Sequence, residues 1–420
     1  MEEERTLLVG FDLCDDYSQL SCIFKNAPEP ESVCITPDQS KFLIPTAVCV
    51  REMTKDWVIG EEAERCRDRM AGVYVDKLLS RLEKQEPVEI YGSMFEPEVL
   101  LEKYFRKIFG ILRQRYQNSS IRQLVVTLQN CTPQVEERLY GVMLALGIDK
   151  DRVKIISHTT GFMYYIVSQP RDVWVNDVAL FDYGVDGLRY CQLSFGRKGT
   201  PMAVVADCVD LSDDISFEML SQMSAERLAH AFESIANLTL HKKIITSLFV
   251  TGRGFEGDWA TDVLRRLCMG RRVFLGQNLY TKGACYAARA LVQNRLQEYC
   301  FLPEECIKAS VSLRVYHDAQ AYQLELASAG DNWKTAGMSC TLILDQCNEL
   351  EFTVSDAVRK DKVLEVMTLD GPMRRERRST RLQLTFHFIS RDMAVVRLRD
   401  IGFGEFYKTN YRVWEQILKI

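Results

Sequence analysis

Two short apolar runs, about 170 residues apart, each end in an aspartate that is followed by a chain reversal. Residues 7–11 lead into Asp12, and residues 178–181 lead into Asp182. Short strands that end in this way are typical of a duplicated α/β fold, in which two aspartates face each other across a cleft. Because carboxylates at such a place can hold a magnesium–phosphate group, Asp12 and Asp182 are candidate ligands.

A third apolar run opens into a glycine turn. Residues 247–250 lead into Gly252 and Gly254, and Gly184 follows Asp182 by two positions. Glycine turns after a buried strand leave room for a phosphate or a nucleoside, because no side chain blocks the approach. The three glycines are therefore candidate cofactor-binding residues.

Strands alternate with helices twice along residues 6–305. Helices are predicted to begin at Pro97 and Pro133, with Thr132 as the N-cap of the second helix and Gly147 at its end. Such alternation indicates α/β lobes that surround a cleft.

The pattern changes near residue 308, after which apolar and polar residues alternate in segments separated by turn residues. Alternation with a period of two is typical of half-buried antiparallel strands. At the C-terminus, residues 410–420 are expected to form a short helix. The sequence therefore predicts two α/β lobes, residues 1–170 and 171–305, followed by an all-β sandwich module, residues 306–420.

Composition limits the classes of function. The net charge of −5 is too small to indicate a nucleic-acid or membrane-surface protein, and no apolar run is long enough for a transmembrane helix. The acidic N-terminus is unlike a secretory signal, so we expect a cytoplasmic protein. The 14 cysteines include no C-x-x-C pair, so we expect no zinc site and reduced thiols, several of them small core residues (Cys22, Cys49, Cys191 and Cys340).

With this order of elements, the chain resembles the actin-like ATPase superfamily, whose lobes are ribonuclease-H-like, and is most similar to the seventy-kilodalton heat-shock chaperones. The resemblance rests on residues 44–46, 57–63, 74–81, 125–147, 155–165, 276–288, 369–372, 382–388 and 392–400. It implies that Lys77 stands at the catalytic lysine and that Gly283 belongs to the second connector between lobes. It also implies that the C-terminal module corresponds to the substrate-binding sandwich, here without a long lid.

The two phosphate-binding loops depart from the family pattern. Cys14, Asp15 and Asp16 stand where the family has glycine and two threonines, and Asp186 lies where the second loop has a glycine pair. Two unit charges 4 Å apart repel by about 4 kcal/mol at an effective dielectric constant of ~20, so these carboxylates oppose a triphosphate. A bridging magnesium ion would reverse the sign of that interaction.

Several candidates also have a structural interpretation. Asp12 can cap a buried strand, and Lys77 can face solvent on a helix. His158, which stands at the position of the family's connector glutamate, can be a structural histidine rather than a base. The arginine-rich run at residues 374–381 is either a solvated loop or a surface for an acidic partner.

These observations favour a non-catalytic, chaperone-like protein of degenerate actin-like type. In this hypothesis nucleotide binding is weakened or lost, and a protein or peptide partner binds the C-terminal module, with no membrane or nucleic-acid partner. The first alternative is a working ATPase with ATP or ADP as cofactor, in which Asp12 and Asp182 hold Mg²⁺ through water and Lys77 orients the attacking water. The second alternative is a small-molecule kinase of the same superfamily.

Overall fold

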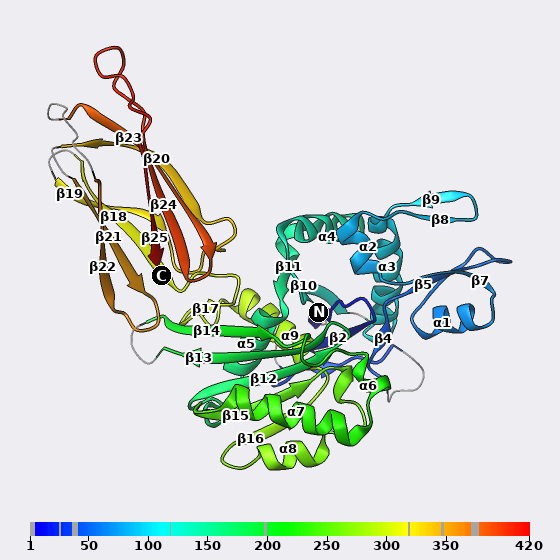
Figure 1. The fold of residues 1–420 in the computed structure, drawn as a ribbon. Helices are drawn as coiled ribbons and strands as arrows, with labels where there is room; N and C mark the ends of the chain where they lie inside the picture. Colours follow the sequence, from blue (N-terminus) through cyan, green and yellow to red (C-terminus); the bar gives the residue numbers. More distant parts are fainter. Residues whose placement is uncertain are drawn as a thin grey trace. The chain divides into compact units, whose positions relative to one another are not determined.

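The computed structural model describes residues 5–24, 27–35, 41–117, 119–196, 200–317, 320–345, 348–370 and 378–420. The chain divides into two compact units, Met1–Cys191 with Val209–Leu296, and Gln192–Cys208 with Gln297–Ile420. The first unit is mixed α/β, and the described part of the second consists of strands and loops (Figure 1). The division passes through β13 (Gly187–Phe195) and β14 (Met202–Asp210).

The first sheet of the α/β unit has the order β11-β10-β1-β2-β3, and β4 also pairs with β2. Its central strand, β1, is parallel to β10 and antiparallel to β2, and β10 is parallel to β11. The strands are β1 (Arg5–Asp12), β2 (Tyr17–Phe24), β3 (Glu31–Ser32), β4 (Ile44–Pro45), β10 (Ser119–Leu128) and β11 (Val153–Ser157). The predicted hairpin after the first apolar run is thereby confirmed, and Asp12 ends the central strand.

Four α-helices and a 3₁₀ turn accompany this sheet. They are α3 (Pro97–Arg115), α4 (Pro133–Ala145), η1 (Lys150–Arg152), α5 (His158–Val167) and α9 (Leu279–Gln293). The predicted starts are confirmed: Pro97 opens α3, and the Thr132 hydroxyl accepts a hydrogen bond of 3.4 Å from the Val135 amide at the start of α4. Four apolar residues with helical spacing on α3 are buried: Leu101, Phe105, Ile108 and Leu112.

Smaller elements follow β4 along the chain. They are β5 (Val48–Arg51), β6 (Trp57–Ile59), α1 (Glu61–Asp68), β7 (Gly72–Val75), α2 (Leu78–Lys84), β8 (Val88–Ile90) and β9 (Ser93–Phe95). A disulfide joins Cys49 in β5 to Cys66 in α1. The expectation that Cys49 is a reduced core thiol is therefore wrong, and so is the same expectation for Cys191, which is also disulfide-bonded. The sequence does not reveal the pair, because β5 and α1 come together only when the chain folds.

The second sheet contributes the order β16-β15-β12-β13 to the α/β unit, with β12 parallel to β15 and β15 parallel to β16. Its strands are β12 (Asp177–Gly184), β13, β15 (Ile245–Thr251) and β16 (Arg272–Leu275). The accompanying helices are η2 (Arg171–Val173), α6 (Met219–Gln222), α7 (Ala225–Leu240), η3 (Arg253–Phe255) and α8 (Thr261–Leu267).

The second unit contains two four-stranded antiparallel sheets, β19-β18-β21-β22 and β20-β23-β24-β25, and a parallel pair, β14 and β17. Their strands are β17 (Tyr299–Leu302), β18 (Ala309–His317), β19 (Gln320–Ala327), β20 (Gly337–Leu344), β21 (Glu349–Asp356), β22 (Lys362–Thr368), β23 (Thr380–Ser390), β24 (Met393–Asp400) and β25 (Val413–Lys419). The predicted helix at 410–420 is wrong, because Val413–Lys419 pairs with β24 as a strand.

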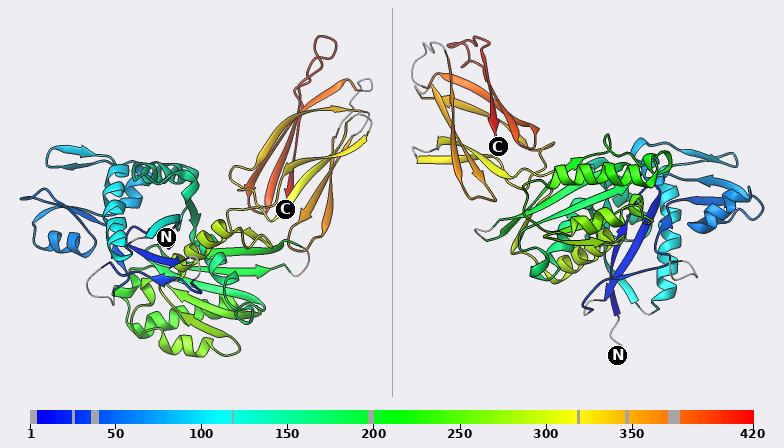
Figure 2. Two further views of the ribbon diagram at one scale, coloured as in Figure 1. Left: turned by 180° about the vertical axis from the view of Figure 1, so that it is seen from behind. Right: turned by 60° about the horizontal axis from the view of Figure 1, so that its bottom comes forward.

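The two four-stranded sheets lie face to face and share one apolar core (Figure 2). Phe352 on β21 and Phe386 on β23 are both fully buried in it. The burial along β23 alternates residue by residue, as the sequence pattern predicts. Among the described residues, no helix is both long and apolar enough to cross a membrane.

Candidate functional site

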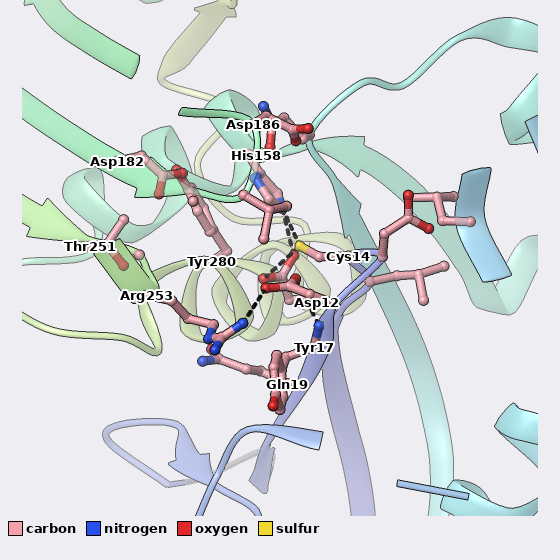
Figure 3. A pocket seen from close by; sticks show the side chains of 18 of the residues that line it. Asp12, Cys14, Tyr17, Gln19, His158, Asp182, Asp186, Thr251, Arg253 and Tyr280 are labelled. Carbon is pink, nitrogen blue, oxygen red and sulfur yellow. Dashed lines mark hydrogen bonds and ion pairs between the residues drawn. The ribbon is translucent and has the colours of Figure 1, made fainter. Parts of the chain in front are cut away.

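A cavity of about 180 Å³ lies in the α/β unit, where the ends of β1, β12 and β15 meet the starts of α5 and α9 (Figure 3). One guanidinium, that of Arg253, lines it together with six carboxylates. These belong to Asp12, Asp15, Asp16, Glu83, Asp182 and Asp186. A concave surface with this excess of negative charge attracts cations and repels phosphate.

Asp12 is held by two side chains of neighbouring elements. It is 6 % exposed, and its Oδ1 accepts a 2.8 Å hydrogen bond from the hydroxyl of Thr127, its register partner on β10. The same Oδ1 lies 2.6 Å from Nε2 of His158, the first residue of α5. Parallel pairing of β1, β10 and β11 brings these groups together, because the carboxyl ends of the three strands lie at one edge of the sheet.

Asp182 has its own ring partner. The hydroxyl of Tyr280 donates a 2.6 Å hydrogen bond to Oδ2 of Asp182. Burial raises the pKa of the Asp182 carboxyl, although His158 and the Tyr280 hydrogen bond oppose the rise. Burial and the negative charge of Asp182 also hold the pKa of Tyr280 well above its usual range, so Tyr280 remains a donor at neutral pH.

The two aspartate–ring pairs are joined through their rings. The His158 imidazole stacks on the Tyr280 phenol ring, with ring centroids 3.9 Å apart and planes inclined by 12°. The order across the site is therefore Asp12, His158, Tyr280 and Asp182. The chain's own side chains thus occupy the space between the two aspartates that the sequence predicted to face each other.

Cys14 lies beside the Asp12–His158 pair. Its Sγ is 3.9 Å from Oδ2 of Asp12 and 3.9 Å from Nε2 of His158. A thiol triad needs the carboxylate on the imidazole nitrogen that faces away from the thiol. Here both groups contact Nε2, and Nδ1 has no hydrogen-bond partner in the described structure. Burial and the charge of Asp12 raise the pKa of the Cys14 thiol well above its usual range, which also opposes a role as nucleophile.

Asp15 is tied to the start of α2. Its Oδ1 accepts a 2.9 Å hydrogen bond from the backbone N–H of Ser80, and its Oδ2 accepts a hydrogen bond from the Ser80 hydroxyl. Ser80 lies in the first turn of α2, where backbone N–H groups lack partners within the helix. Asp15 therefore caps a helix from a distant loop, and its carboxylate faces the cavity already hydrogen-bonded.

Asp16 is paired with the cationic group of the cavity. Its Oδ2 is 3.1 Å from Nη1 of Arg253, and its Oδ1 accepts a 2.8 Å hydrogen bond from the Tyr17 amide. The Arg253 guanidinium lies over the Tyr17 ring, 4.4 Å from the centroid. Arg253, which directly follows Gly252, therefore holds the loop that contains Asp16 and Tyr17.

Two further carboxylates add repulsion at the cavity. The pKa of Asp186 is raised by partial burial and then by the negative charges of Asp15, Asp16 and Asp182. The pKa of Glu83 is raised by partial burial and by Asp15 and Asp186. The local field therefore disfavours additional negative charge.

The structure brings four of the predicted site residues to the cavity: Asp12, Asp182, Gly184 and Gly252. Gly252 has φ +96°, and a Cβ there would lie 2.7 Å from Oδ1 of Asp182, so glycine is required. The other three predicted residues do not line the cavity. Gly254 packs under the Tyr183 ring, Gly283 packs against the Gly161 backbone, and Lys77 is exposed at the start of α2.

Sequence reasoning missed the partners of these acids, namely Tyr280, Arg253, Thr127 and Ser80. Each comes from a segment far along the chain from the carboxylate that it contacts. Thr127 follows from the strand order, because it lies next to the end of the strand that a parallel pairing places beside β1. Tyr280 and Ser80 carry no local signal, because a tyrosine or serine near a helix start is common without such a role.

A second cavity of about 460 Å³ adjoins the first and shares five lining residues with it: Tyr17, Gln19, Leu43, Arg253 and Gln277. Three glutamates and two cationic side chains line it: Glu61, Glu64, Glu256, Lys41 and Arg253. Lys41 and Glu61 form an ion pair of 3.1 Å across its rim. The cleft is thus longer than the acidic cavity alone, and its charge is more balanced away from Asp12.

Comparison with known families divides the chain near residue 305. Residues 29–304 match the C-terminal model of DUF5716, a family of unknown function, and residues 306–420 match DUF8552, a domain of unknown function. No curated protein matches the chain significantly. The two matches meet where the sequence pattern changes from alternating strands and helices to strands. Because the first match covers more than half of the chain, the chain belongs to the DUF5716 family.

Proposed function

We propose that this protein is a degenerate, chaperone-like relative of the actin-like ATPases that acts through protein–protein contacts and binds nucleotide weakly or not at all. One observation carries the proposal: the carboxylates at the predicted magnesium–phosphate site are engaged by the chain's own side chains. Asp12 contacts His158, and Asp182 contacts Tyr280. In the replaced phosphate loop, Asp15 is hydrogen-bonded to Ser80.

The arrangement of the two sheets supports the actin-like part of the proposal. In each, a central strand with an aspartate at or near its end is followed by a neighbouring strand, and a parallel strand comes later in the sequence. These strands are β1, β2 and β10 in the first sheet and β12, β13 and β15 in the second. This internal repeat is what a duplicated lobe would produce. An all-β sandwich follows it, as in the chaperones that the sequence resembles.

Electrostatics support the loss of nucleotide binding. Six carboxylates and one guanidinium line the acidic cavity, and each carboxylate within 4 Å of a phosphate charge would cost about 4 kcal/mol at an effective dielectric constant of ~20. A magnesium ion held through Asp12 and Asp182 would have to share these carboxylates with His158 and Tyr280. The working-ATPase alternative also needs Lys77 in the cleft, whereas Lys77 is exposed outside the cavity lining.

The partner surface is proposed on the C-terminal sandwich. Strand β22 is the last strand of its sheet and exposes three apolar side chains, Val363 at 53 %, Leu364 at 58 % and Val366 at 41 %. An edge strand of this kind can accept an extended peptide by main-chain hydrogen bonding. A peptide held in this way by an exposed edge would bind weakly unless the partner adds contact area.

The arginine-rich run at residues 374–381 suggests that the partner is acidic. Arg374, Arg375 and Arg377 lie outside the described residues. The two described arginines have partners of their own: Arg378 is 3.0 Å from Asp345, and Arg381 donates to the Gly402 carbonyl at 3.1 Å. The acidic-partner idea therefore depends on the first three arginines.

Calorimetric titration of the full chain with ATP and ADP, with and without Mg²⁺, tests the proposal. We expect no saturable binding tighter than a dissociation constant of about 10 μM, which corresponds to about −7 kcal/mol. Replacing Cys14-Asp15-Asp16 by Gly-Thr-Thr should strengthen binding, because it removes two carboxylates. An Asp213→Thr variant, which changes an exposed aspartate away from the cavity lining, is the matched control. If the unchanged protein binds Mg-ATP with a dissociation constant smaller than about 10 μM, the proposal is overturned and a working ATPase is favoured.

A further inference from the structure

Three side chains with different donor atoms meet at the floor of the acidic cavity. The carboxylate of Asp12, the thiol of Cys14 and the imidazole of His158 each offer one ligand atom, and these atoms lie within 4.8 Å of one another. They come from the end of β1, the loop after it and the first residue of α5 (Figure 3). We propose that Asp12, Cys14 and His158 form a binding site for a zinc-class divalent cation.

The distances fit a tetrahedral ion after a small adjustment. Bonds of about 2.0 Å to nitrogen and oxygen and about 2.3 Å to sulfur imply ligand–ligand separations of about 3.3 Å for N···O and about 3.6 Å for S···N and S···O. Sγ of Cys14 is 3.9 Å from Nε2 of His158, and one carboxylate oxygen of Asp12 lies within 4.8 Å of both atoms. Nε2 and Oδ1 of Asp12 are 2.6 Å apart, so an ion would take the place of the hydrogen bond and open this pair by less than ~1 Å.

The direction of the contacts favours a ligand set over a proton relay. In a relay, the thiol and the carboxylate lie on opposite nitrogens of the imidazole. Here Cys14 and Asp12 both contact Nε2 of His158, so three donor atoms converge on one point. Convergence of this kind is what a common ion requires.

The chemistry of the donors selects the class of ion. Nitrogen, thiol sulfur and carboxylate oxygen together suit zinc and similar first-row metals, whereas Mg²⁺ prefers oxygen ligands in octahedral geometry. A bound dication deprotonates a coordinating thiol, so the neutral thiol of Cys14 is no obstacle. The ion would also offset part of the charge of the six carboxylates that line the cavity.

The surroundings hold the proposed ligands in place. Thr127 donates to Oδ1 of Asp12 at 2.8 Å, and the Tyr280 ring stacks on His158 at 3.9 Å. In known metal sites, a hydrogen bond from the second ring nitrogen of a ligating histidine raises metal affinity by ~10–100-fold. Nδ1 of His158 has no such acceptor in the described structure. We therefore expect weaker binding than in a fully supported zinc site.

The site would leave one coordination position for water or a small ligand. Among the described His, Cys, Asp and Glu side chains, the cluster has three members, and all three line the cavity. Three protein ligands and one open position are the pattern of zinc sites that bind a further molecule. Because Cys14 is partly exposed, an ion can enter from the cavity.

Cobalt(II) titration of the reduced, metal-free full chain tests this inference. We expect one equivalent of cobalt to produce a cobalt–thiolate charge-transfer band together with the visible bands of a four-coordinate ion, and zinc to displace it. Cys14→Ser should abolish the charge-transfer band, and His158→Ala should weaken cobalt binding by at least ~10-fold.

Matched controls separate the site from adventitious binding. Cys268 is the exposed free thiol among the described cysteines and His230 is an exposed histidine, so Cys268→Ser and His230→Ala should leave the spectrum unchanged. Far-ultraviolet circular dichroism in chelator should show that Cys14→Ser is folded. Absence of the band in the unchanged protein, or its survival in folded Cys14→Ser, would overturn the inference. Neither result depends on whether the protein binds nucleotide, so this inference and the proposed function fail separately.

Discussion

The acids of the cavity differ in what their partners allow them to do. Asp12, Asp15 and Asp16 are hydrogen-bonded or ion-paired in three different ways, to His158 and Thr127, to Ser80, and to Arg253. Asp186 experiences mainly burial and the repulsion of Asp15. A carboxylate whose pKa is raised by folding destabilises the folded state whenever it is charged. The charge of Asp186 should therefore lower the free energy of unfolding.

We expect Asp186→Asn to stabilise the protein at neutral pH in buffer that contains chelator. Because Asp186 is only partly buried and still contacts solvent, the gain should be only about 0.5 kcal/mol and should shrink as salt rises. Its pKa is raised in the folded state, so the gain is present above that pKa and disappears as the pH falls below the ordinary aspartate range. Urea unfolding between pH 7 and pH 3 measures it, with Asp213→Asn as control. A gain that persists at pH 3 would contradict the electrostatic cause.

At this scale the sequence predicts strand-end residues and misses their partners. Asp12, Asp182 and Gly252 line the cavity because a short apolar strand followed by a turn fixes where its last residue lies. Lys77 was assigned from resemblance alone, and the structure places it outside the cavity lining. Tyr280 could not be predicted, because its contact with Asp182 joins residues 98 positions apart.

The starts of α3 and α4 can be predicted from local chemistry, whereas the C-terminal strand β25 cannot. Thr132 caps α4 and Pro97 opens α3, since both effects act within a single turn of helix. Residues 413–419 form β25 instead of the expected helix. A short amphipathic run fits either period, and only its neighbour β24, which pairs with it, decides for the strand.

The disulfide between β5 and α1 gives a prediction about these elements. Cys49 and Cys66 are 17 residues apart, and closing a loop of about this length stabilises a fold by about 3 kcal/mol in the chain-entropy model. We expect the double variant Cys49→Ala/Cys66→Ala to lose that amount in urea unfolding under oxidising conditions. In strong reductant the unchanged protein should lose most of its advantage. A Cys268→Ala variant, which changes an exposed free thiol, is the control. Equal stability of the double variant and the unchanged protein under oxidising conditions would contradict the disulfide.

In the whole molecule, the C-terminal unit is larger than the module that the sequence predicts. Its core lies within residues 307–420, as the change of pattern near residue 308 suggests. The compact unit also includes β17 and most of β14. Arg391, in the turn after β23, donates to the carbonyls of Ala206, Leu302 and Pro303. Such contacts involve a surface-type residue in the sequence, so the pattern of alternation could not reveal them.

Arg391 should therefore affect the full chain and the isolated module differently. In the full chain we expect Arg391→Leu to lower the opening free energy of β23 and β24 by about 3 kcal/mol, because it leaves several buried carbonyls without a donor. A fragment of residues 306–420 lacks those carbonyls and keeps only the carbonyl of Cys306 as a partner, so the loss there should be no more than about 1 kcal/mol. Amide hydrogen exchange of β23 and β24 measures both, and Arg397→Leu, at an exposed pair with Glu415, is the control. Equal losses in chain and fragment would contradict this assignment.

The stacked rings of His158 and Tyr280 have a mechanical consequence. Asp12 belongs to the first sheet and Asp182 to the second, so the stack and its two hydrogen bonds connect the sheets through side chains. An ATPase that works by opening and closing its cleft needs this span to change length when nucleotide binds. Here His158 and Tyr280, which are part of the chain and not a ligand, connect Asp12 to Asp182. Side-chain contacts that join the two sheets favour one conformation of the cleft. A fixed conformation suits a protein that presents a constant binding surface and does not suit one that changes conformation with bound nucleotide.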